Sequence, residues 1–180
     1  IIISRIEKWY NRLSGMFVED RQSLTAEYCW SKEPIPFAKR LEKKYKSITK
    51  GESWGKEWDS AWFHLKGKIN KEWTKKIVVA DLDFSGEGLV YDPKGNEIQG
   101  ITHASIFEPN FVRTRVILPA TCINKNNVEI WVETAANSLF GIFVDPDPEQ
   151  NNPKRHGSFD AKVEMIDIGV FRKDIWDLYL

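Results

Sequence analysis

Three carboxylates that lie close together in the sequence, Asp81, Asp83 and Glu87, are the first candidates for chemistry. Asp81 and Asp83 share one face of an extended segment, because side chains two residues apart on a strand point the same way. Oxygen ligands of this kind could hold calcium, and paired carboxylates could act as the acid and the nucleophile of a glycosidase. A solvent-facing strand edge, where charge discourages aggregation, accounts for the same residues and is the interpretation that we favour.

Tryptophans are a second candidate group, because Trp54, Trp58, Trp62 and Trp73 fall within one short span. Flat aromatic rings of this kind can stack on the apolar face of a sugar. They are equally suited to a core or to an interface with another domain, and we favour that interpretation. The candidates for contact with a carbohydrate or with another domain are Trp54, Trp58, Trp73, Glu87, Glu97, Gln99 and Asn137.

Three common motifs of catalytic and nucleotide-binding sites are missing from the sequence. It contains no Gly-x-Ser-x-Gly nucleophile turn, no phosphate-binding P-loop and no dinucleotide-binding Gly-x-Gly-x-x-Gly. His64, His103 and His156 lack the local pairing that zinc ligands usually show. Cys29 and Cys122 are far apart, and we expect two reduced, buried thiols. We therefore predict no catalytic residue, no metal site and no cofactor in this chain.

The charges of the chain balance, with 26 basic and 26 acidic residues. This composition gives no electrostatic indication of binding to nucleic acid or to an anionic membrane. The opening Ile1-Ile2-Ile3 is too short for a signal peptide or a membrane span, so we expect a cytoplasmic protein. Because the chain starts without Met and ends on Leu-Tyr-Leu, we expect it to be part of a longer polypeptide.

The elements that would position these residues are mostly strands. Eight Trp, ten Phe and five Tyr favour sheet, and a turn is expected at 92–95, where Pro and Gly occur together. The predicted strands are 61–65, 76–84, 87–91, 104–107, 111–118, 128–134, 139–144 and 161–171. Strands of this number and length predict an all-β fold, a β-sandwich or jelly roll.

Helices are predicted mainly in the first fifty residues. Ser4 and Glu7 form a capping box ahead of apolar residues at helical spacing, which predicts a short N-terminal helix. A second helix is predicted to begin at Pro36 and to run to Ile48. We therefore divide the chain into a helix and linker, 1–50, that pack on a β-sandwich domain, 51–180.

Several segments resemble the N-terminal, non-catalytic region of an α-mannosidase of glycoside hydrolase family 38, and the cytosolic class II type most closely. They keep their order and rough spacing along the chain from Gly51 on. Each is weakly specific alone, whereas the ordered set is quite specific. The matching segments are 51–55, Trp58, 61–63, 86–91, 95–101, 132–141, 146–149 and 170–178.

The resemblance implies a galactose-binding-like β-sandwich that belongs to a zinc-dependent retaining exo-α-mannosidase acting on terminal α-mannosides. In that family the zinc signature begins with His-x-Asp, and none of the three histidines here is followed by Asp two residues on. The resemblance therefore places zinc and catalysis in another domain of the polypeptide. The partners that it implies are the remainder of the mannosidase and further copies of it, with a mannose-containing oligosaccharide as a candidate ligand.

The role implied for this region is architectural: it would pack on the catalytic barrel, wall the substrate entrance or make oligomer contacts. The segments 92–95 and 137–141 are the candidate contact surface. The alternatives are an independent carbohydrate-binding module and a protein-interaction domain. The orientation of Trp54, Trp58 and Trp73 distinguishes a sugar-binding module from an excised domain. Exposed rings favour sugar binding, whereas buried rings with a separate apolar patch left open favour a domain that lacks its partner.

Overall fold

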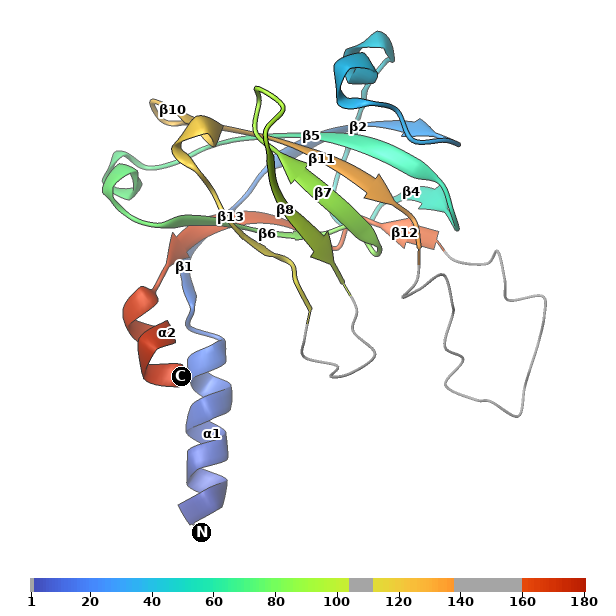
Figure 1. Cartoon of the computed structure of the whole chain (residues 1–180). Coiled ribbons are helices and arrows are strands. Elements are labelled where there is room, and N and C mark those ends of the chain that lie inside the picture. The colour runs from blue at the N-terminus through green and yellow to red at the C-terminus, as the bar shows by residue number, and fades with distance from the viewer. Residues whose placement is uncertain (1, 104–111, 138–159) are drawn as a thin grey trace, which may run out of the picture.

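The computed structural model describes residues 2–103, 112–137 and 160–180. In this part of the chain the strands form two main antiparallel sheets and one two-stranded sheet (Figure 1). The four-stranded sheet has the spatial order β1 (Val18–Ser23), β13 (Met165–Phe171), β6 (Val78–Asp83) and β9 (Arg115–Ile117). The small sheet pairs β12 (Asp160–Lys162) with β4 (Ser53–Lys56).

The larger sheet has seven strands and carries the candidate contact residues Glu87, Glu97 and Gln99. Its order is β3 (Lys46–Ile48), β2 (Thr25–Ser31), β5 (Ser60–Lys68), β11 (Asn127–Ala135), β7 (Glu87–Tyr91) and β8 (Glu97–Thr102), with β10 (Ile123–Asn124) beside β11. The helical elements are α1 (Ile2–Ser14), α2 (Lys173–Tyr179) and the short 3₁₀ helices η1 (Phe37–Glu42), η2 (Lys71–Lys75) and η3 (Ala120–Cys122).

The core lies between the two main sheets, and the register of the strands explains which residues fill it. On β5, Phe63 and Leu65 are fully buried in the main apolar cluster, together with Ile130 and Val132 of the neighbouring β11. Side chains alternate between the faces of a strand, so Trp62 points to the other side of the sheet. The all-β sandwich predicted from the sequence is confirmed.

The outer face of the seven-stranded sheet carries a second aromatic layer. Trp62, Tyr91 and Trp131 form a buried cluster, and Phe37 and Tyr45 pack against it from the segment that crosses this face. This cover explains why the first part of β5, residues 60–63, is buried continuously rather than at alternate positions. A strand that is buried on both faces has no reason to alternate.

The first fifty residues contribute more to the sandwich than a helix and a linker would. β1 pairs with β13 in one sheet, and β2 pairs with β3 and β5 in the other. The helix predicted from Pro36 to Ile48 is also replaced, because η1 ends at Glu42 and β3 begins at Lys46. Packing of this segment on the aromatic layer outweighs its helical spacing.

The other predicted elements fall into three groups. The N-terminal helix and the strands near 61–65, 76–84, 87–91, 128–134 and 161–171 are present, with β12 and β13 sharing the last range. Of the strand predicted at 111–118, the described part contains β9 alone. The strands predicted at 104–107 and 139–144 lie outside the described residues. No helix in the described ranges is long and apolar enough to cross a membrane.

Candidate functional site

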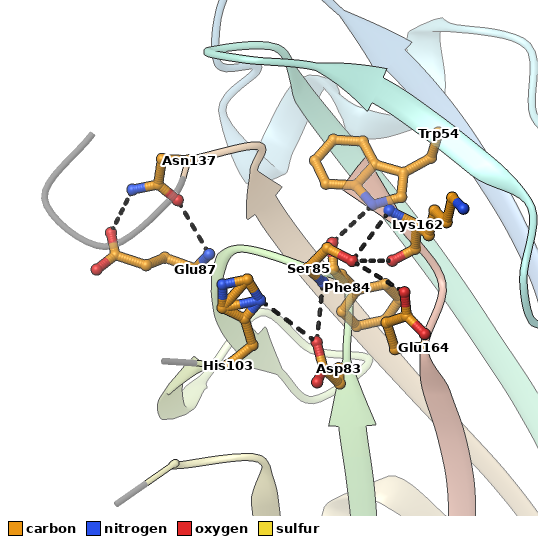
Figure 2. A network of polar contacts seen from close by, with 9 residues as sticks. All are labelled: Trp54, Asp83, Phe84, Ser85, Glu87, His103, Asn137, Lys162 and Glu164. Carbon is orange, nitrogen blue, oxygen red and sulfur yellow. Dashed lines mark hydrogen bonds and ion pairs between the residues drawn. The ribbon is translucent and has the colours of Figure 1, made fainter. Parts of the chain in front are cut away.

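The connection between β6 and β7 is the most highly organised polar region near the predicted residues (Figure 2). Ser85 has a positive φ of 58°, and its backbone N–H donates to Asp83 Oδ1 at 2.8 Å. Gly86 follows, and a Cβ atom there would lie 2.2 Å from the carbonyl oxygen of Ala135. The glycine therefore allows the turn to lie directly against the end of β11.

Asn137 and Glu87 bind each other reciprocally across this turn. The Asn137 side-chain oxygen accepts from the Glu87 backbone N–H at 3.1 Å, and its Nδ2 donates to Glu87 Oε2 at 2.8 Å. Asn137 is nearly buried, so these bonds replace water that burial removes. The pair fixes the chain where it leaves β11, which is a structural role that needs no ligand.

A second set of hydrogen bonds joins the same turn to β4 and β12. The indole nitrogen of Trp54 donates to the carbonyl oxygen of Phe84 at 2.9 Å. The Ser85 hydroxyl donates to the Lys162 carbonyl and accepts from the Lys162 N–H, both at 3.2 Å. Figure 2 shows these bonds converging on the turn from different strands. The network locks one end of the sandwich together.

The three carboxylates proposed as calcium ligands have separate partners. Asp81 lies on the central strand β6, where its buried carboxylate binds Arg21 at 2.5 Å and Arg115 at 2.7 Å. Asp83 accepts from Ser85 N–H, and Glu87 binds Asn137. Among the described residues no group of three His, Cys, Asp or Glu could hold a metal ion. The favoured interpretation as a solvent-facing edge is wrong for Asp81, because strands flank β6 on both sides.

The tryptophan candidates divide into core and surface residues. Trp54 and Trp73 belong to the main core cluster, so their rings are not available to stack on a ligand. Trp58 is 58% exposed and has an unusual φ of 67°. Its backbone N–H donates to the Ala136 carbonyl at 2.7 Å, which places it at the same end of the sandwich as Asn137.

The remaining candidates lie elsewhere on the larger sheet. Glu97 is exposed at the start of β8, and the Gln99 side chain donates to the Arg115 carbonyl at 2.9 Å. The predicted turn at 92–95 is present, with Gly95 N–H donating to the Asp92 carbonyl at 3.0 Å and a positive φ at Gly95. Asp92 is buried, but hydrogen bonds, the strongest from Asn96, hold its pKa down to about 2. His156 and the part of the 137–141 segment beyond Asn137 lie outside the described residues.

One ionisable cluster was not anticipated from the sequence. On the outer face of β11, the Arg40 guanidinium lies between the rings of Phe37 and Trp131, 3.6 and 4.3 Å from their centroids. The His64 ring also stacks on Trp131, with the two ring centroids 3.7 Å apart. Its Nε2 lies 2.8 Å from Glu129 Oε1. Burial lowers the pKa of His64 despite this carboxylate. The alternation of Glu129, Trp131 and Glu133 in the sequence was the available signal.

Comparison with known families decides which kind of domain this is. The sequence model of the family described as "Alpha-mannosidase, jelly roll domain" matches residues 21–160. The chain belongs to this family. The match begins within β1, so the family's jelly roll domain includes the strands that precede Gly51.

The curated relatives of this jelly roll domain are also named as alpha-mannosidases. The chain is 23% identical to mouse alpha-mannosidase 2C1 over 186 residues, which is 97% of this chain and 17% of that protein. It is 24% identical to alpha-mannosidase G of Dictyostelium discoideum, over 100% of this chain and 17% of the relative. The jelly roll domain therefore spans less than a fifth of the length of these relatives.

Solved structures support the fold of the jelly roll domain. A β-glucuronidase from Ruminococcus gnavus in complex with uronic isofagomine matches with a TM-score of 0.53 and 14% sequence identity. The match covers 83% of this chain and 28% of that chain. At this identity the likeness shows a shared fold and nothing about ligand or activity.

Proposed function

We propose that this chain is the N-terminal accessory domain of a zinc-dependent retaining exo-α-mannosidase that hydrolyses terminal α-mannosides. Its role is architectural, in packing on the catalytic domain and holding it in place. The observation that carries the proposal is the family match over residues 21–160. It is supported by the polar network at Ser85 and Asn137, whose described groups bind one another rather than facing an open site.

The zinc of such an enzyme would be bound outside this chain. The described residues do not fit a zinc ion, because no three potential ligands come together among them. We therefore assign no step of the hydrolysis to this jelly roll domain. A wall of the substrate entrance, contacts within a homo-oligomer and a cytoplasmic location belong to the same proposal. The end of the sandwich that carries Trp58 and Asn137 is the candidate for the entrance wall.

The test compares two substrates on the complete α-mannosidase polypeptide that contains this chain. For Trp58→Ala and Asn137→Ala, we measure kcat and KM with 4-nitrophenyl α-mannoside and with a mannose oligosaccharide. An architectural domain predicts that KM changes in parallel for the two substrates while thermal stability falls for Asn137→Ala. A rise in KM for the oligosaccharide alone would place this end of the sandwich at the substrate entrance, and it would overturn a role that is limited to packing on the catalytic domain.

A second candidate function is an independent carbohydrate-binding module, and the exposure of Trp58 favours it. A bulky residue with positive φ is uncommon, and backbone strain of this kind concentrates at functional positions. Isothermal titration of the 180-residue chain with mannose oligosaccharides tests this function directly. Binding that Trp58→Ala abolishes would establish the module, and the absence of heat at millimolar sugar would leave the architectural role.

A further inference from the structure

Helix α1 exposes an apolar face that the described part of the chain leaves uncovered. Ile3 and Ile6 are 73% and 61% exposed, and Trp9 and Tyr10 are also exposed. These residues recur at helical spacing and therefore share one side of the helix. Figure 1 shows α1 projecting from the sandwich, with α2 beside the half of α1 that is nearer to the strands.

The described contacts of α1 are too few to account for a stable helix. Tyr10 stacks on Tyr179 of α2 with ring centroids 4.1 Å apart, and a hydrogen bond between these tyrosines raises the pKa of Tyr179. A helix of 13 residues is only marginally stable in water by itself. Further burial of its apolar face is the ordinary source of stability for such a helix.

Helix α2 is a firm base for this surface, because it is attached to the sandwich at its start. Arg172 donates to Glu19 of β1 at 3.0 Å and to Asp174 at 2.8 and 2.5 Å. Trp176 and Tyr179 pack edge-on against the buried Phe17, with centroids 5.1 and 4.9 Å away. Leu178, the neighbour of Tyr179 on α2, is a further exposed apolar side chain beside α1.

One flank of α1 is strongly basic. Arg5, Lys8 and Arg12 line a shallow concavity together with Trp9, and the Arg12 guanidinium lies 5.3 Å from the centre of the Trp9 ring. Positive charges beside an apolar stripe select a partner that has carboxylates beside an apolar groove. If two copies of α1 paired antiparallel, this flank would face itself, so charge disfavours that form of self-association.

We propose that the apolar face of α1, continued by Trp176 and Leu178 of α2, is the surface on which the rest of the α-mannosidase polypeptide docks. This inference rests on the proposed function. The relatives place more than four fifths of their length outside the aligned region, which supplies a partner of sufficient size. The docking site on that partner is an apolar groove edged by Asp and Glu, which meet Arg5, Lys8 and Arg12.

Photo-crosslinking on the complete polypeptide tests the location of the surface. Ile6 is replaced by p-benzoylphenylalanine, and Leu41, which is 65% exposed on η1 at the far side of the sandwich, is replaced in a matched control. Isotopically light and heavy protein are mixed before irradiation. We expect crosslinks from position 6 to peptides outside residues 1–180 of the same copy, and few such crosslinks from position 41.

The same experiment identifies the occupants that would overturn the inference. Light-to-heavy crosslinks from position 6 would show that a second copy covers the face. Crosslinks from position 6 that are no more abundant than those from position 41 would show that the face is open. Cosedimentation with vesicles of phosphatidylserine and phosphatidylcholine, lost in the double variant Arg5→Glu, Arg12→Glu, would show that a membrane surface covers it.

Variants measure what the docking surface contributes. Trp9→Ser, and separately Arg5→Glu with Arg12→Glu, should accelerate hydrogen exchange in α1 about tenfold in the complete polypeptide, as loss of an interface anchor does. Leu41→Ser should leave exchange in α1 unchanged. Unaltered exchange in both α1 variants would overturn the inference. If the polypeptide hydrolyses α-mannosides while these variants behave as the parent does, the docking surface is wrong and the proposed function stands.

Discussion

At Gly86 the backbone of the turn passes so close to β11 that there is no room for a side chain. A Cβ atom would lie 2.2 Å from the Ala135 carbonyl oxygen, and backbone atoms move apart only at a cost to the surrounding bonds. We expect Gly86→Ala to lower the free energy of unfolding by about 2–3 kcal/mol, in the range for overpacking. Urea denaturation followed by circular dichroism measures the change.

Gly100 provides the matched control for this substitution. Gly100 lies on β8 of the larger sheet, and the nearest atom to its added Cβ would be 3.9 Å away, an ordinary contact. Gly100→Ala should change stability by less than about 0.5 kcal/mol. Equal losses for the two alanine variants would show that close approach to Ala135 is not the reason for glycine at 86.

His64 should make the stability of the domain dependent on pH. Burial against Trp131 lowers its pKa below the ordinary value of 6.5, although Glu129 opposes the shift. The unfolded chain then binds a proton more readily than the folded one. The stability that neutral His64 contributes is therefore complete above pH 6.5 and is lost as the pH falls through the lowered pKa.

Replacement by phenylalanine isolates this effect, because the ring that stacks on Trp131 is retained without a titrating nitrogen. We expect the free energy of unfolding of His64→Phe to fall less than that of the parent between pH 7 and pH 5. The measurement is urea denaturation at a series of pH values. Parallel pH profiles for the two proteins would contradict the assignment.

The sequence predicted which residue types tend to be buried, but it did not predict which partners surround an individual residue. The expectation that Cys29 and Cys122 are free and buried is confirmed. The favoured interpretation of Asp81 as a solvent-facing edge residue was wrong, and that of Trp54 did not separate a core from an interface, because sequence neighbours do not show which partners approach from other strands. Arg21 and Arg115 lie 60 and 34 residues from Asp81, and Phe84 lies 30 residues from Trp54.

At the level of elements, Asp81 links three strands of the four-stranded sheet. Its carboxylate on β6 binds Arg21 of β1 and Arg115 of β9. Asp81→Ala would leave two arginines without their shared partner. Because both arginines are partly exposed, solvent reduces the penalty, and we expect a loss of about 1–3 kcal/mol in the free energy of unfolding.

The exposed pair between Lys173 and Asp177 on α2 is the control for this prediction. It has the i,i+4 spacing, and both of its side chains are more than half exposed. Asp177→Ala should therefore change stability by less than about 0.5 kcal/mol. Denaturation of the two variants under the same conditions compares them, and equal effects would mean that burial of Asp81 adds nothing.

Element types were predicted best where local pattern and tertiary packing agree. The N-terminal helix and the turn at 92–95 depend on neighbouring residues, and both are present. The helix begins at Ile2, however, so Ser4 lies within its first turn and not at the cap position that the capping box predicts. Residues 36–48 have apolar side chains at helical spacing, but the chain is not helical throughout, and Phe37 of η1 and Tyr45 just before β3 pack on the cluster of Trp62, Tyr91 and Trp131. Leu41 is exposed, and Ile48 lies in the main core between the sheets. The three residues of that cluster belong to three different strands, so the sequence near Pro36 does not reveal them.

For the whole molecule, the two thiols report cooperative unfolding. Burial raises the pKa of Cys122 to about 12 and also raises the pKa of Cys29. Thiolate is the reactive form, so both groups should be inert to Ellman's reagent in the native protein. We expect both to react only in the denaturant range in which circular dichroism is lost. Reaction of either thiol in the native state would show local opening around that thiol, at β2 for Cys29 or at η3 for Cys122.

The sequence by itself determined the class of the fold and, through ordered motifs, its similarity to α-mannosidases. Strand periodicity, turn residues and helical spacing are local patterns, and they can be interpreted without knowledge of the segments that pack against them. Tertiary structure alone decided that Trp54 and Trp73 are core residues, that Asp81 is held by two arginines, and that β1 and β2 belong to the sheets. It also showed that the described part of the chain leaves the apolar face of α1 uncovered. The physical reason is that burial and ion pairing depend on contacts between distant segments, whose register is set only when the sheets pack.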